Sequence, residues 1–224
     1  MKEIINKVWH LSLIIGMRFF GLFVVMAVLS AYATDLPGAT PMLIGLAVGG
    51  YALTQAALQV PFGVLSDKIG RKKAILIGLL IFVAGSIIAG MADDIYMLLL
   101  GRFLQGAGAI GSVIIAMISD HVREDERAHA MAAMGMVIAL AFTAAMVVGP
   151  IIGGLTGGVS TLFYLTAAMS ILSIILLFTV VPEPPMITHT FAEEEAKVKD
   201  VFKDKDLVRM YVCLLYTSPS PRDS

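Results

Sequence analysis

Two arginines are the residues of this sequence whose presence is hardest to explain by packing alone. Arg18 and Arg102 each stand about seven residues inside a long apolar run. Burying an arginine at the middle of a membrane helix costs about 2.5–3.5 kcal/mol on insertion scales. The alternative is that each side chain reaches the nearest membrane interface, although at ~1.5 Å per residue both lie roughly 10 Å deep. We expect both arginines to face the protein interior and to have a functional role.

Polar side chains near these arginines are spaced as stripes on two helices. Arg102, Gln105, Ala109 and Ser112 share one face of a helix, and a second run carries a polar side chain every fourth residue. Two stripes on separate helices favour a shared hydrated cavity, and the alternative is hydrogen bonding between packed helices. The candidate cavity-lining residues are Arg18, Tyr51, Gln55, Gln59 and Ser112.

A charged loop after the second apolar run reads GVLSDKIGRKK from Gly63 to Lys73. Its aspartate, Asp67, is suited to capping a helix start or to lying at the positive end of a neighbouring helix dipole. Gly63 would allow two helix ends to approach closely, and Gly70 would allow a sharp turn. Arg71 is placed to pair with a carboxylate. A loop that is only positively charged explains the lysines, including Lys72, but not the two glycines.

The elements that position these residues are long apolar helices. The chain has 224 residues, a mean hydropathy of +0.88, 58% hydrophobic residues and 15% charged residues. Soluble domains are about a quarter charged, so the composition argues against a water-soluble globular protein. A helix needs about 20 apolar residues to cross a bilayer, and no removable signal peptide is expected. The sequence predicts an all-α polytopic membrane protein whose six spans lie in residues 11–33, 42–65, 74–92, 95–119, 130–155 and 160–181.

The distribution of positive charge predicts the orientation of these spans. The N-terminal tail, the loops after the second and fourth spans, and the segment after the sixth carry thirteen Lys and Arg residues. The other three loops carry none, and their only charges are Asp35, Asp93 and Asp94. Because cytoplasmic loops are enriched in Lys and Arg, we expect both ends of the chain to be cytoplasmic.

Three segments of the sequence resemble motifs of the major facilitator superfamily. Gly63 to Lys73 is similar to its motif A, G-x-L-x-D-x-x-G-R-[KR]-[KR], on the expected loop. The fourth span resembles motif B, and the fifth resembles the antiporter motif C, where Pro150 should bend the helix because it removes a hydrogen bond. The residues that carry motifs B and C are Arg102, Gln105 and Gly106, then Gly149, Pro150, Gly153 and Gly154.

This resemblance implies a fold and a function. Six spans correspond to the N-terminal half of such a carrier, an inverted 3+3 repeat, which would need a C-terminal six-helix half as its partner. The amino-acid sequence of these spans is similar to that of the YajR-type drug:proton antiporters in particular. That implies a secondary active transporter in a bacterial inner membrane that exports small amphipathic or drug-like molecules. Within transporters the alternative is an uptake symporter or facilitator for sugars or organic acids; outside them, a non-transporting sensor or scaffold.

The resemblance also implies a gate. In the family, the aspartate and arginine of motif A form a charge cluster with an acid at the end of the fourth span, which here corresponds to Asp67, Arg71 and Asp120. The cluster would hold the two halves together in the outward-facing state. No Asp or Glu lies inside any of the six spans. A proton-coupled carrier needs a titratable group in the membrane, so we expect that carboxylate in the other half or at a helix end.

The domain organisation follows from these patterns. Residues 1–181 form the six-helix bundle, 182–209 a cytoplasmic linker between halves, and 210–212 the start of a seventh span. Residues 213–224 resemble the translation of a transposase-type sequencing adapter, so we expect the gene to continue differently after residue 212. The sequence has no nucleotide-binding fingerprint, nucleophile–base pair or metal-ligand spacing. We expect no enzyme, no metal or other cofactor and no nucleic-acid partner; the expected partners are substrate, protons and lipid.

Overall fold

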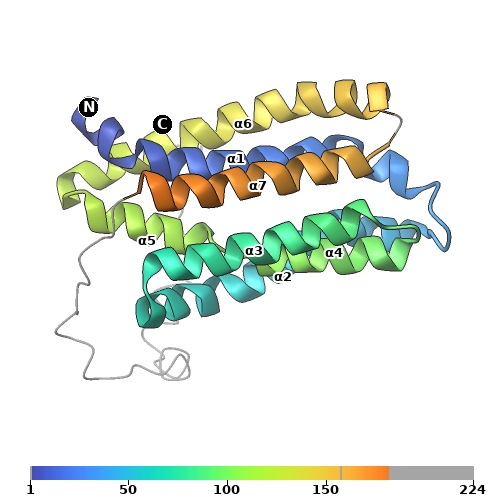
Figure 1. Ribbon diagram of the computed structural model, residues 1–224, viewed down its shortest axis with the longest axis horizontal. Helices are drawn as coiled ribbons and strands as arrows, with labels where there is room; N and C mark the ends of the chain where they lie inside the picture. The colour runs from blue at the N-terminus through green and yellow to red at the C-terminus, as the bar shows by residue number, and fades with distance from the viewer. Residues whose placement is uncertain (1, 157, 182–224) are drawn as a thin grey trace, which may run out of the picture. The chain divides into compact units, whose positions relative to one another are not determined.

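The computed structural model describes residues 2–156 and 158–181, and in this part of the chain every regular element is a helix (Figure 1). Six stretches are long and apolar enough to cross a membrane, which confirms the predicted fold class. The linker 182–209, the start of a seventh span at 210–212 and the segment 213–224 lie outside the described residues. The helices are α1 (Lys2–Ala33), α2 (Pro41–Ile69), α3 (Arg71–Gly90), α4 (Ile95–Ala107), α5 (Gly111–His121), the short 3-10 helix η1 (Glu124–Glu126), α6 (Arg127–Thr156) and α7 (Ser160–Thr179).

Local sequence signals set the helix ends that matter for the site. Thr40 caps α2, because its side chain accepts a hydrogen bond from the Leu43 backbone N–H at 3.3 Å, and Pro41 follows at the first helical position. Asp94 caps α4 in the same way from the Met97 N–H at 2.7 Å. Between α2 and α3 the backbone turns at Gly70, whose φ of 96° is a left-handed value that favours glycine. The predicted sharp turn at Gly70 is therefore present.

The helices pack as a bundle in which α1 contacts both α6 and α7, α3 contacts α4 and α7, and α2 contacts α4. Figure 1 shows α1 and α7 running side by side, with α6 along the other side of α1. One apolar cluster includes Ile14 and Ile75, and a second includes Val25 and Leu98. A small aromatic cluster around Phe82 forms a third group of buried residues. The buried side chains of Arg18 and Arg102 contact the Phe82 and Tyr51 rings of this third cluster.

The fourth span is broken, which corrects the expectation of one continuous helix over 95–119. Helix α4 ends at Ala107 and α5 begins at Gly111. Between them the Ala109 and Ile110 N–H groups donate to the Ala107 and Gly108 carbonyls, both at 2.9 Å, so these bonds span only two residues. Non-helical backbone at membrane depth is tolerated where protein buries it, and residues 108–110 are buried.

Candidate functional site

A node of buried polar side chains, here called the central node, consists of Arg102, Gln105 and Ser86. The Arg102 side chain is fully buried. Its Nε donates to the Ala47 carbonyl at 2.9 Å and its Nη1 to Gln105 Oε1 at 2.8 Å. Gln105 Nε2 donates in turn to Ser86 Oγ at 2.8 Å. The node therefore joins α4 to α2 and α3 through hydrogen bonds in which a cation participates.

The Arg102 guanidinium also makes a second set of contacts with α2. Its Nη2 lies 3.5 Å from the Val48 carbonyl, and its Cζ lies 5.3 Å from the centre of the Tyr51 ring. A cation over an aromatic face is attracted by the ring quadrupole. Arg102 thus faces the protein interior, as the sequence predicts, but it is enclosed by α2 and α4 and hydrogen-bonded throughout.

Arg18 is likewise buried, at 1% exposure, and it contacts the break in the fourth span. Its Nη2 donates to the Gly108 carbonyl at 2.6 Å, and its Cζ lies 4.9 Å from the centre of the Phe82 ring. The Nε and Nη1 atoms are buried without a hydrogen-bond partner among the described residues. Unpaired buried donors are costly, and more so on a charged group. The hydrogen bond to the Gly108 carbonyl therefore contributes strongly to holding this side chain in place.

The proposed cavity lining is only partly compatible with this geometry. Arg18 and Tyr51 are buried within the bundle, and a cavity role for them stays a prediction. Gln55 and Gln59 are half-buried on the same face of α2, and a cavity role for them stays a prediction. Ser112 is half-buried, and its Oγ donates to the Gln59 carbonyl at 2.8 Å. Because the span breaks at residues 108–110, Ser112 does not share a continuous helical face with the polar residues of α4.

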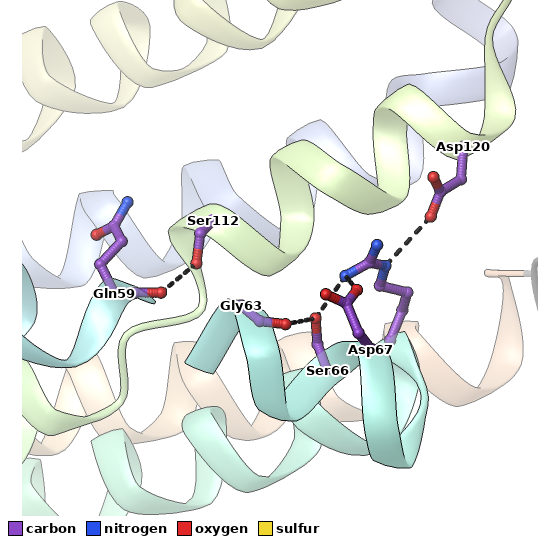
Figure 2. A network of polar contacts seen from close by, with 7 residues as sticks. Gln59, Gly63, Ser66, Asp67, Ser112 and Asp120 are labelled. Carbon is purple, nitrogen blue, oxygen red and sulfur yellow. Dashed lines mark hydrogen bonds and ion pairs between the residues drawn. The ribbon is translucent and has the colours of Figure 1, made fainter. Parts of the chain in front are cut away.

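The end of α2 and the start of α3 form a second polar group with α5, shown in Figure 2, which we call the junction cluster: Ser66, Asp67, Arg71 and Asp120. Arg71 Nη1 lies 2.6 Å from Asp67 Oδ1, and Arg71 Nε lies 3.2 Å from Asp120 Oδ2. Nη1 also donates to Ser66 Oγ at 2.5 Å. The structure therefore brings together the three charged residues that the family resemblance implies, from the second, third and fourth spans.

Two details of this loop differ from the sequence-based expectation. Asp67 lies in the last turn of α2, so it does not cap a helix start. A Cβ added at Gly63 would meet only Ser112 Oγ, at 3.8 Å, which is an ordinary contact, so no close helix approach within this half requires that glycine. Lys72 is half-buried in the first turn of α3.

The four residues of the antiporter motif differ in how tightly they pack. Helix α6 remains continuous through Pro150, so the predicted bend stays a prediction. A Cβ at Gly149 would lie 2.5 Å from the Val24 carbonyl oxygen, so α1 and α6 approach closely there. Gly153 has room for a Cβ at 3.7 Å from Val28, and a Cβ added at Gly154 would meet no atom of another element within 4 Å. Close packing in this half therefore requires a glycine at position 149 alone among the three.

Sequence reasoning missed several residues that hold these groups together. Ser66 and Ser86 are buried hydroxyls that accept from Arg71 and Gln105, and Gly108 supplies the carbonyl for Arg18. A serine inside an apolar span is a weak signal, because serine often bonds its own helix. Within residues 2–156 and 158–181, no three His, Cys, Asp or Glu side chains lie where they could hold a metal ion.

The fold and site define a class: a six-span helical membrane protein with buried arginines and a charge cluster between its second and third spans. The chain belongs to the Major Facilitator Superfamily, since the sequence profile of that family matches residues 11–219. Members of this family are transporters rather than enzymes. The predicted family and the prediction that the chain is not an enzyme are confirmed.

Two sequence relatives place the chain further within this family. It is 44% identical over 194 residues to the inner membrane transport protein YajR of Escherichia coli (strain K12), covering 87% of this chain and 42% of that protein. It is 30% identical over 187 residues to the quinolone resistance protein NorA of Staphylococcus aureus, covering 82% of this chain and 47% of that protein. The chain thus spans less than half the length of these two relatives.

Solved structures with the same fold include two transporters. The peptide transporter POT in complex with alafosfalin matches with a TM-score of 0.68 and 17% identity, over 93% of this chain and 45% of that chain. The human organic anion transporter MFSD10 (TETRAN) matches with a TM-score of 0.63 and 16% identity, over 80% and 48%. At these identities the likeness shows the fold alone.

Proposed function

We propose that this chain forms the N-terminal half of a secondary active transporter that exports small amphipathic or drug-like molecules in exchange for protons. The observation that carries the proposal is the junction cluster, in which Arg71 bridges Asp67 and Asp120 across three spans. A multi-pass membrane protein used only as a scaffold has no need for such a polar bridge at a helix junction. The names of two relatives, an inner membrane transport protein and a quinolone resistance protein, support the same function.

The proposed location is the bacterial inner membrane, with the junction cluster and both ends of the chain on the cytoplasmic side. The support is the charge distribution: Lys68, Lys72 and Lys73 lie next to the cluster, and the loops at the other side of the membrane carry no Lys or Arg. The six-helix C-terminal half, the substrate and the protons are the proposed partners. With no acid inside these six spans, the proposed proton-coupling carboxylate lies in the other half.

The experiment that tests this function measures flux in reconstituted vesicles. We expect a complete carrier containing this half to move a fluorescent amphipathic cation only when a pH gradient is imposed. Residues 1–212 alone should give no gradient-driven flux, because they supply one wall of a two-walled path. Movement of sugars or organic acids, driven by the gradient or independent of it, would favour the uptake alternative, and a complete carrier without any flux of these probes would favour a sensor or scaffold. Flux by residues 1–212 would contradict the half-carrier assignment unless two copies assemble.

The junction cluster is proposed to act as a latch that holds the two halves together in the outward-facing state. Exposed ion pairs contribute only about 0–1 kcal/mol, and the Asp67 side chain is 62% exposed in this half. Contact of a partly buried network with a helix dipole of the partner half supplies about 1–3 kcal/mol, enough to shift a two-state equilibrium about tenfold.

This latch predicts a graded response to charge removal in the complete carrier. Asp67→Asn should lower transport and increase labelling, from the cytoplasmic side, of a thiol introduced into this half. Asp120→Asn should have the same effects more weakly, because Asp67 is the exposed member of the cluster that can contact the partner half. Asp93→Asn, in a loop on the other side of the bundle, is the matched control. Normal flux and unchanged labelling in both acidic variants would exclude the latch.

A further inference from the structure

The buried hydroxyl of Ser66 lies between a helix end and the guanidinium of Arg71. The Ser66 residue is 1% exposed. Its Oγ donates to the Gly63 carbonyl at 2.7 Å, and this contact is drawn in Figure 2. A serine hydroxyl has one proton and two lone pairs, so with its proton directed at Gly63 it can only accept from a second group. That group is Arg71 Nη1, at 2.5 Å.

The contact with Arg71 distinguishes Ser66 from the other buried serines that bond their own helix. Ser170 Oγ donates to the Thr166 carbonyl at 2.9 Å, four residues earlier on α7. Ser170 is as fully buried as Ser66, but it contacts no charged side chain in the hydrogen bonds of the described residues. Satisfying a backbone carbonyl is therefore common to both serines, and orienting a cation is specific to Ser66.

The three partners of Arg71 differ in how well they can hold it in place. Asp67 is largely exposed, so water and salt screen its pairing with Arg71. Asp120 is 20% exposed but contacts only Nε, at 3.2 Å. Ser66 is the buried partner, and a hydrogen bond to a charged group is worth more there than in water. Because the guanidinium is a rigid plane, fixing Nη1 against Ser66 also fixes the direction of Nε.

We propose that Ser66 is a positioning residue of the latch: it holds the Arg71 guanidinium so that Nε faces Asp120 on α5. This inference rests on the proposed function of the junction cluster. Without the hydroxyl, Arg71 keeps its charge and its exposed partner Asp67, but it loses the buried contact that defines its orientation. The link from α3 to α5 then weakens although every charged residue of the cluster is present.

The test compares three serine variants in a complete carrier containing this half. The reporter is a thiol introduced as Val64→Cys at an exposed position of α2, in a carrier whose other cysteines are replaced by serine. We expect Ser66→Ala to accelerate cytoplasmic-side labelling of the reporter by roughly fivefold, which corresponds to about 1 kcal/mol. Ser170→Ala, the same change at a buried serine away from Arg71, should leave the rate unchanged. Ser66→Thr keeps the hydroxyl, so its labelling rate should equal that of the carrier that retains Ser66.

A double-variant comparison separates positioning from general destabilisation. In an Arg71→Gln background, Ser66→Ala should add nothing, because the two residues act through one contact. If the effects of the two substitutions on the labelling rate were fully additive, the inference would be overturned. It would also be overturned if Ser66→Ala left the labelling rate unchanged while Arg71→Gln accelerated it. If Arg71→Gln itself has no effect, the latch fails and the role of Ser66 fails with it. Acceleration by Ser66→Thr equal to that by Ser66→Ala would also count against positioning, since the hydroxyl would then be irrelevant.

Discussion

We expect Arg102→Ala to abolish gradient-driven transport in the complete carrier and to lower the unfolding free energy of the six-helix half by about 2 kcal/mol. The substitution removes donors to the Ala47 carbonyl and to Gln105, and it leaves the Gln105 side-chain oxygen buried without its cationic partner. Both effects follow from loss of the link between α2 and α4. Thermal unfolding in detergent and flux in vesicles measure them separately.

Two further variants show which property of Arg102 matters. Arg102→Lys keeps the charge but loses the planar fork that reaches α2 and Gln105 together, so it should recover stability only in part and transport poorly. Arg123→Ala is the matched control, because the Arg123 side chain is 80% exposed in a loop. Membrane insertion should be normal in all three. Full flux and unchanged thermal stability of Arg102→Ala would mean that the arginine has no structural or coupling role.

The features that local sequence determines could be predicted from it. Apolar runs of membrane-spanning length gave the six spans, and Gly70 adopts the left-handed turn that a glycine between two helices indicates. The proximity of Arg71 to Asp120 came from the family resemblance, since 49 residues separate the two and spacing alone does not relate them. Burial of Arg18 and Arg102 could be expected from the cost of leaving a cation in lipid.

The break in the fourth span was not predicted, although Gly106, Gly108 and Gly111 lower the helix propensity there, because the contacts that hold it come from other helices. No proline marks residues 107–111, and the apolar pattern continues through them. The chain departs from the helix where Gly108 packs against the backbone of Gly78 on α3 and where its carbonyl accepts from Arg18 on α1. Both partners are distant in sequence. The same limit explains why Ser66 was missed: its function depends on which cation the fold brings to it.

The contact between α2 and α4 also depends on Gly106, where the backbones of the two helices approach closely. A Cβ at this position would overlap the Tyr51 carbonyl oxygen and the Thr54 hydroxyl. The carbonyl belongs to the α2 backbone, so it cannot rotate away as a side chain could. The Arg102 bond to the Ala47 carbonyl lies one helical turn from Tyr51 on the same helix. Separating the helices to fit a methyl group would therefore also lengthen this bond.

Gly106→Ala should consequently lower the melting temperature of the bundle in detergent by roughly 4–10 °C, from an overpacking cost of about 1–3 kcal/mol. Gly45→Ala is the matched control on α2, where nothing lies within 4 Å of the added Cβ. It should be neutral or slightly stabilising, because alanine favours a helix over glycine by up to ~1 kcal/mol. The losses in Gly106→Ala and Arg102→Ala should combine to less than their sum, since both disrupt one contact. Equal melting temperatures for Gly106→Ala and Gly45→Ala would show that α2 and α4 can separate without cost, which would contradict a central node that depends on their close approach.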